Sequence, residues 1–152
     1  MIRSTLNILA IFLLVGFIAI GCKKDPPPLS ERIAKNWSAN TVKHGNVVVF
    51  EKTGSSNTAD YSSFRISLAA GFTATFVELN GDTFNGQWEL IGNNTLRLKN
   101  LSSTTNQKPP TGSNGTIEFT INSINDTTLD LTRVTDNPKT GNTRNQYVLS
   151  IP

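Results

Sequence analysis

The sequence predicts an all-β fold, and three observations lead to that prediction. Short runs of Thr, Val, Ile and Phe begin at residue 37, turns rich in Gly and Asn separate them, and apolar residues alternate with polar ones within several runs. Beyond residue 36 no segment keeps a 3.6-residue apolar period, so no later helix is expected. We therefore predict an up-and-down antiparallel barrel of eight or nine strands with a short N-terminal helix.

The short helix is expected directly before the first strand. Ser30 is a suitable N-cap because its hydroxyl can accept a hydrogen bond from a free backbone N–H of the first turn. The helix body then covers residues 31–36, with Glu31 in the first turn, where a negative charge is favourable. Ile33 is the apolar residue that this helix turns inward.

Nine strands are expected after the helix. They cover residues 37–43, 47–52, 64–69, 72–78, 84–91, 95–101, 116–123, 128–134 and 144–151. Alternation is clear where Ile117, Phe119 and Ile121 share one face, and again at Leu129 and Leu131. Because successive strand residues point to opposite faces, this pattern predicts an apolar interior and a polar exterior.

The connections after residue 52 alternate strictly between short and long. The short ones lie at residues 70–71, 92–94 and 124–127. The long ones lie at residues 53–63, 79–83, 102–115 and 135–143. Alternate connections of a meander lie at opposite ends, so we expect the long loops to surround an open mouth and the tight turns to form a closed base.

The number of strands limits how the barrel can close. Nine strands cannot close an antiparallel meander, because the first and last would run parallel. One solution treats residues 37–52 as a single long strand with a bend or bulge at His44, Gly45 and Asn46, which leaves eight strands. The alternative is a real hairpin at these residues, with the first strand packed as an extra edge.

The N-terminal residues have the anatomy of a secretory signal. Arg3 precedes residues 8–20, thirteen residues without a charge or a hydrogen-bonding side chain, and then come Gly21 and Cys22. The apolar run is shorter than the roughly 20 residues that a bilayer-spanning helix needs. The segment 19–22, with sequence Ala-Ile-Gly-Cys, resembles the lipobox of bacterial lipoproteins, although Ala19 stands where that motif usually has Leu.

The lipobox resemblance implies that the protein is a lipid-anchored lipoprotein. Residues 1–21 would be removed as the signal peptide, and Cys22 would receive a diacylglyceryl thioether and an acyl chain such as palmitate on its amino group. Several chains anchor firmly because each buried CH₂ contributes about 0.8 kcal/mol. Lys23 after the lipidated residue favours sorting to the outer membrane, on its periplasmic or cell-surface face. Residues 22–29, with three prolines, form a stiff tether to a barrel domain at 30–152.

Composition excludes several classes of function. The 152 residues hold 14 Lys and Arg against 11 Asp and Glu, and no basic stripe suited to nucleic acid is present. One Cys excludes an internal disulfide, and one His excludes metal sites built from several histidines. We therefore expect a single monomeric domain with no metal, no cofactor and no nucleic-acid partner.

Two groups of residues are candidates for catalysis. His44 is interpreted as a solvated turn residue, since no nucleophile pattern accompanies it. Glu78 and Asp82 flank the turn at residues 80–81, where carboxylates commonly bind the local backbone, so acid–base work there is not expected. The expectation is that the protein is not an enzyme.

Several motifs together resemble the lipocalin-like lipoproteins of diderm bacteria, which belong to the calycin-type barrels. These motifs are the helix leading into Trp37, the strand pair over residues 64–76 joined at Gly71, the segment 84–98 with its Gly-Gln-Trp, and the segment 121–131. The resemblance covers residues 30–151. It implies a lipocalin-like barrel whose interior takes a ligand or is filled by side chains.

Two functions follow from these expectations. The leading hypothesis is a binding module of the cell envelope whose barrel takes a small apolar or amphipathic ligand, with no catalytic residue. The interior residues assigned to that ligand are Trp37, Phe64, Phe76, Trp88, Phe119 and Tyr147. The alternative is a filled barrel that binds another envelope protein or a glycan, or inhibits a hydrolase, through its long loops. An enclosed apolar void would favour the first, and a packed core would favour the second.

Overall fold

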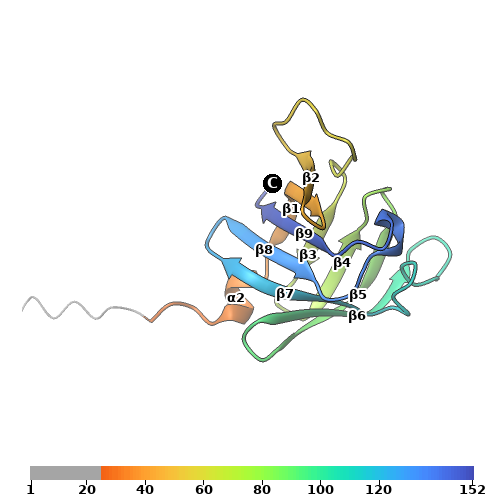
Figure 1. Ribbon diagram of the computed structural model, residues 1–152. Coiled ribbons are helices and arrows are strands. Elements are labelled where there is room, and N and C mark those ends of the chain that lie inside the picture. The colour runs from red at the N-terminus through yellow and green to blue at the C-terminus, as the bar shows by residue number, and fades with distance from the viewer. Residues whose placement is uncertain (1–24) are drawn as a thin grey trace, which may run out of the picture.

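Figure 1 shows the computed structural model, which describes residues 25–152. The predicted signal peptide over residues 1–21, the lipidation site Cys22 and the sorting residue Lys23 lie outside the described residues. Within residues 25–152 the chain forms a closed antiparallel barrel with a short helix at one end. The predicted all-β fold is confirmed.

The strands lie close to their predicted positions. The helix α2 spans Leu29–Ile33. The nine strands are β1 (Asn36–His44), β2 (Val47–Glu51), β3 (Arg65–Leu68), β4 (Thr73–Val77), β5 (Thr83–Ile91), β6 (Thr95–Ser103), β7 (Ile117–Ile124), β8 (Thr128–Arg133) and β9 (Asn145–Ser150). A short 3-10 helix, η1 (Pro138–Thr140), lies between β8 and β9. Both ends of every strand fall within two residues of the predicted bounds.

The barrel closes through the pairing of β1 with β9. The sheet order is β2-β1-β3-β4-β5-β6-β7-β8-β9, and β1 also pairs with β9. This pairing is antiparallel and places Ser38 opposite Ser150 and Val42 opposite Tyr147. Since β2 stands outside the ring, eight strands form the barrel and β2 is an additional strand.

The additional strand shares one edge of β1 with β3. Residues 41–44 of β1 pair with β2, and residues 36–38 pair with β3. Both strands run antiparallel to β1. The segment 52–64 therefore connects two strands that pair with different parts of the same edge of β1. The expectation of one bent strand over residues 37–52 is therefore wrong. The ring has an even number of strands because β2 lies outside it and β3 takes the next place beside β1.

The turn at residues 45–46 is a real hairpin. Gly45 has a φ of 57°, a left-handed conformation that suits glycine at the start of a two-residue hairpin turn. The Gly45 N–H donates to the carbonyl of Arg144 at 3.0 Å, which holds the turn beside the start of β9. The alternative expectation of a hairpin is confirmed, but the extra strand is β2 and not the first strand.

The helix is shorter and begins earlier than predicted. It starts after Pro28, and no side chain caps its first turn, so the expected N-cap Ser30 lies inside the helix. Ile33 is fully buried as predicted, and its carbonyl accepts a hydrogen bond from Trp37 Nε1 at 2.9 Å. None of the helices within residues 25–152 has the length and apolar character needed to cross a bilayer.

Loop length distinguishes the two ends of the barrel. The tight turns at residues 69–72, 92–94 and 125–127 form the base, next to α2 at the left of Figure 1. The segments 78–82, 104–116 and 134–144 form the opposite end, which we call the mouth. The fourth long loop, 52–64, differs from the prediction. It leaves the barrel after Glu51, opposite Thr41 of β1, and protrudes at the top of Figure 1.

Aromatic side chains fill the interior. The rings of Phe64 and Tyr147 stack with their centroids 4.8 Å apart. Phe76 meets Phe64 edge to face at 5.7 Å, and Phe119 meets Tyr147 in the same way at 6.0 Å. Such pairs stabilise a core beyond the burial of their area. Because these residues come from β4, β7 and β9 and from the residue before β3, their contacts join different walls of the barrel.

Trp88 belongs to the same core near the base. Its side chain is 1% exposed, and its Nε1 donates to the carbonyl of Ala69 at 2.9 Å. The ring also contacts Phe72 of the base turn at 5.1 Å. Gly86 on the same strand lies against β6 so closely that an added Cβ would be 2.5 Å from the carbonyl oxygen of Lys99. The bulged pairing here therefore depends on glycine.

We expect Trp88→Ala to lower the free energy of unfolding by about 3 to 5 kcal/mol, because burial is lost and a cavity remains. Chemical denaturation monitored by circular dichroism measures this change. Phe72→Ala is the matched control, since Phe72 contacts the same ring but is 54% exposed, and its loss should be clearly smaller. A Trp88→Ala midpoint equal to the wild type would contradict the inward orientation.

Candidate functional site

A layer of buried polar residues lies just inside the mouth. Glu78 follows the last residue of β4, Arg133 ends β8, and Asn145 begins β9. All three are buried, with exposures of 4%, 3% and 0%. Asn137, from the segment 134–144 that joins β8 to β9, is also buried. Buried polar groups are costly without partners, so this layer is the part of the interior where chemistry is concentrated.

Strand alternation places two of these residues inward. In β8 the buried positions are Leu129, Leu131 and Arg133, so Arg133 continues the row of apolar residues toward the mouth. Glu78 in the same way continues the inward row of β4, after Phe76. The register places Arg133 directly opposite Phe119 of β7, which bounds the guanidinium stem on one side.

Asn145 organises the side of the layer formed by β9. Its Oδ1 lies 3.1 Å from the hydroxyl of Thr140 and 2.8 Å from that of Thr143. Its Nδ2 donates to the hydroxyl of Tyr147 at 3.1 Å. This network holds the last residue of η1, Thr140, and the following Thr143 against the start of β9, so the segment 134–144 has a defined position over the mouth.

Lys139 connects opposite walls of the mouth. Its Nζ contacts the carboxylate of Glu78 and lies 3.3 Å from Oδ2 of Asp82. Burial lowers the pKa of Lys139, but the contacts with the two carboxylates outweigh burial and raise it. Lys139 lies on η1, between β8 and β9, whereas Glu78 and Asp82 lie between β4 and β5, so the contact joins two loops of the mouth. The considered acid–base pair of Glu78 and Asp82 is thus a pair of carboxylates held by one lysine.

Arg133 is the member of the layer without a partner. Its buried Nε has no hydrogen-bond partner, and within residues 25–152 its guanidinium forms no ion pair. A guanidinium carries five N–H donors and is always charged, so its burial without partners is unfavourable. Burial raises the pKa of the phenols of Tyr61 and Tyr147, and the charge of Arg133 opposes that rise.

Tyr61 reaches this region from the loop 52–64. Its ring is 1% exposed and contacts Phe64 and Tyr147 at 5.7 and 6.2 Å. Its hydroxyl lies 2.7 Å from Nε2 of His44. Burial lowers the pKa of His44, so the ring is neutral near pH 7. The interpretation of His44 as a solvated turn residue is wrong, because it ends β1 and holds a buried tyrosine.

A hollow of about 370 Å³ opens at the mouth beside Lys139. Its lining is largely hydroxyl, amide and charged groups, with Phe84 and Pro109 as apolar members. The other lining residues are Gly81, Asp82, Thr83, Ser103, Thr104, Thr105, Asn106, Lys108, Thr111 and Lys139. Lys139 therefore stands between this hollow and Glu78 of the buried layer.

The six aromatic residues assigned to a ligand are all buried. Their exposures are 0% to 3%, for Trp37, Phe64, Phe76, Trp88, Phe119 and Tyr147. Hollows of 240 to 460 Å³ open on the surface of residues 25–152, and five of the best defined are lined by none of the six. The aromatic side chains contact one another and occupy the space inside the barrel.

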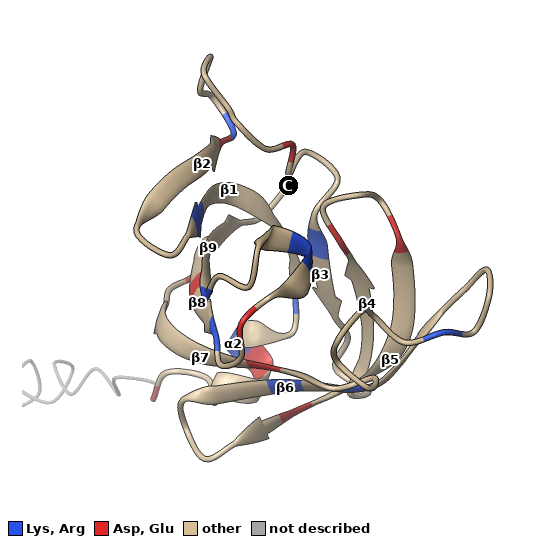
Figure 2. Cartoon of the chain, turned by 45° about the vertical axis from the view of Figure 1, so that its right-hand side comes forward, with Lys and Arg blue, Asp and Glu red and all other residues tan. Residues whose placement is uncertain are grey.

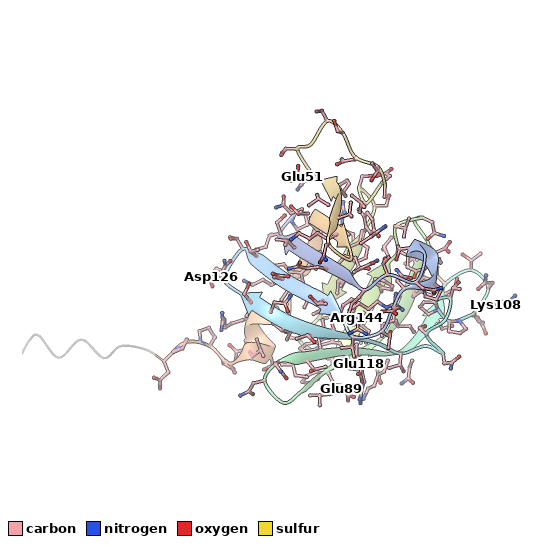
Figure 3. All side chains as sticks on the ribbon, in the orientation of Figure 1. Glu51, Glu89, Lys108, Glu118, Asp126 and Arg144 are labelled. Atoms are coloured by element: carbon pink, nitrogen blue, oxygen red, sulfur yellow. The ribbon has the colours of Figure 1, made fainter. Side chains whose placement is uncertain are left out.

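Charged residues on the outer surface form a separate ion-pair cluster. Arg97 pairs with Glu89 at 3.0 Å and with Glu118 at 2.7 Å, and Lys99 also contacts Glu89. Figure 3 shows Glu89 and Glu118 on the outside of the barrel, away from Lys108 at the mouth. Figure 2 shows acidic and basic residues interspersed over the strands. Within residues 25–152 no group of three His, Cys, Asp or Glu side chains is arranged to hold a metal.

The described chain resembles two solved structures. A lipocalin-like protein from Bacteroides uniformis is 16% identical, and the match covers 80% of this chain and 99% of that chain with a TM-score of 0.50. This barrel is lipocalin-like. An uncharacterized protein from Bacteroides eggerthii is 13% identical over 78% of this chain and 98% of that chain, with a TM-score of 0.44. No protein-family model and no curated protein matches the sequence.

The lipocalin-like fold agrees with the resemblance seen in the sequence motifs. Sequence reasoning identified Glu78 of the mouth layer as an acid–base candidate, but it missed Arg133 and Asn145. One signal was present. Arg133 stands two residues after Leu131 in an alternating strand, where an inward apolar residue is expected. Tyr61 had no such signal, since the loop 52–64 has no periodic pattern.

We expect the stability of this lipocalin-like barrel to fall as the pH is lowered from about 7.5 to 5.5. Burial holds the pKa of His44 below its unfolded value, so in this interval the unfolded chain binds more protons than the folded one. Denaturant unfolding at several pH values measures the slope. His44→Gln keeps a hydrogen-bonding partner for Tyr61 and should flatten the slope, because the chain has no other histidine. An unchanged slope in this variant would contradict the assignment.

Proposed function

We propose that the protein is a lipid-anchored binding module of the cell envelope that binds a small amphipathic ligand at the mouth of its barrel. The lipid is attached at Cys22, and Lys23 favours the outer membrane, on its periplasmic or cell-surface face. The observation that carries the ligand site is the hollow beside Lys139, which adjoins a buried layer of polar residues.

The packed interior supports placing the ligand at the mouth. The stacked and edge-to-face rings of Phe64, Tyr147, Phe76 and Phe119 occupy the centre of the barrel. A ligand bound among the six buried aromatics would have to displace them from a close-packed core, which is unfavourable. The hollow at the mouth needs no such rearrangement, and its polar lining favours an amphipathic ligand over a purely apolar one.

The geometry of attachment supports the same site. α2 follows the proline-rich tether and lies at the base, so the chain leaves the barrel at the end opposite the mouth. Lys108 at the mouth and Asp126 in a base turn lie at opposite sides of the molecule (Figure 3). An anchor at Cys22 therefore leaves the mouth facing away from the membrane surface and open to solutes.

The second candidate is an interaction module whose mouth loops bind another envelope protein or a glycan. The aromatic packing inside the barrel favours it, because recognition then falls to the surface. The two candidates share the same end of the molecule and differ in the size of what is bound. A small co-purified ligand supports the first, and its absence from the wild-type protein supports the second.

Cys22→Ser should abolish lipidation and leave the barrel folded, because the thiol is the site of thioether formation and no second Cys exists to form a disulfide. Metabolic labelling with an alkyne fatty acid measures the lipid, and circular dichroism measures the fold. Lys23→Ser is the matched control, since it changes the neighbouring residue and keeps the thiol. Label that persists on Cys22→Ser would contradict the lipoprotein assignment.

Thr105→Trp should remove a ligand adduct seen by native mass spectrometry of the full chain in detergent, because the indole fills the hollow at the mouth. Thr73→Trp is the matched control, as it places the same side chain in a hollow of about 240 Å³ at the base. The adduct should persist in that variant. An adduct lost only in Thr73→Trp would place the ligand at the base and contradict the proposal.

A further inference from the structure

We propose that Arg133 is the anchor for a ligand carboxylate, bound in the polar layer beneath the segment 134–144. This inference rests on the proposed function, since it names the charged group of the ligand that the mouth takes. The observation that carries it is the burial of Arg133. The residue is 3% exposed, and the Nε of its guanidinium has no hydrogen-bond partner.

The neighbouring residues do not satisfy Arg133. The buried carboxylate of the layer, Glu78, is in contact with Lys139, and Lys139 also contacts Asp82. The side-chain oxygen of Asn145 is occupied by the hydroxyls of Thr140 and Thr143. The guanidinium thus keeps a buried Nε–H donor without a partner, in a residue that is only 3% exposed. A bound anion would satisfy them with charge-assisted hydrogen bonds.

The surroundings favour a carboxylate among anions. A planar guanidinium binds a carboxylate through two parallel hydrogen bonds, and one guanidinium balances one negative charge. A phosphate dianion would leave a second charge without a contact partner in the same buried layer, which is costly. The hydroxyl of Tyr147 accepts from Asn145 Nδ2, so its own proton is available to an anion beside Arg133.

The segment 134–144 controls access to this site. It begins directly after Arg133 and is held by Lys139 on Glu78 and by the hydroxyls on Asn145. Lys139 also lines the hollow at the mouth, so the hollow and the buried layer are separated by this lysine. A ligand whose polar body occupies the hollow would therefore contact Lys139 and lie next to the buried layer that contains Arg133.

The test uses the full chain in detergent with propionate as the probe and propionamide as its uncharged analogue. The Nε–H resonance of Arg133, followed by ¹⁵N NMR, should shift downfield with propionate in a saturable manner and remain unchanged with propionamide. Chloride at the same ionic strength controls for salt. A larger saturable shift with inorganic phosphate than with propionate would overturn the assignment to a carboxylate. No shift with either anion would overturn the site.

Variants provide an independent measurement. Arg133→Met should unfold at a higher temperature than the wild type without propionate, because a buried charge without a partner is removed. Its affinity for propionate should fall about tenfold or more, the equivalent of one charge-assisted hydrogen bond. Arg144→Met is the matched control, because Arg144 is an exposed mouth arginine paired with Asp136, and it should retain the wild-type response.

The outcomes separate this inference from the proposed function. If Arg133→Met lowers the unfolding temperature and the wild type does not respond to propionate, Arg133 is a structural residue and the carboxylate site is overturned. If Thr105→Trp still removes the native adduct in that case, ligand binding at the mouth stands without Arg133. The NMR measurement on the wild type decides the inference even if Arg133→Met does not fold.

Discussion

An antiparallel meander closes into a barrel only when its first and last strands run in opposite directions, and much of this structure follows from that constraint. The nine strands of this chain meet that condition because β2 and β3 share one edge of β1, which leaves eight strands in the ring. The chain must therefore leave that edge after β2 and return to it at β3, which creates the loop 52–64. This loop carries Tyr61 into the interior, where it contacts His44 and the stacked aromatic rings.

Packing divides the interior into two regions with different chemistry. Toward the base and centre, aromatic and aliphatic side chains from every strand exclude water and join the walls. Near the mouth the inward positions of β4, β8 and β9 become Glu78, Arg133 and Asn145. The apolar region joins the walls of the barrel, and the polar region is closed above by the segment 134–144, which Lys139 and the hydroxyls of Thr140 and Thr143 hold in place. A packed core and a site at the mouth are therefore compatible within one lipocalin-like fold.

The fold was largely predictable because alternation and turn residues are local signals. Ile117, Phe119, Leu129 and Leu131 indicated their inward faces directly, and the six interior aromatics are all buried. The position of the extra strand was not predictable, since Gly45 and Asn46 suit a bend as well as a hairpin. Ser30 was misassigned because the helix begins one residue earlier, at Leu29, without a side-chain cap. The partners of Lys139 could not be predicted, because Glu78 is 61 residues away in the sequence.

The pairing of β1 with β9 also determines when the barrel can form. Ser38 bonds to Ser150, and the two are separated by 112 positions in the chain, so the contact that completes the ring joins the first strand to the last. Contacts of such long sequence separation slow folding. Until β9 has been synthesised, β1 and β8 present open backbone edges that can pair with other chains. Folding in the cell therefore has an interval of exposure to aggregation that ends only with the arrival of the C-terminal strand.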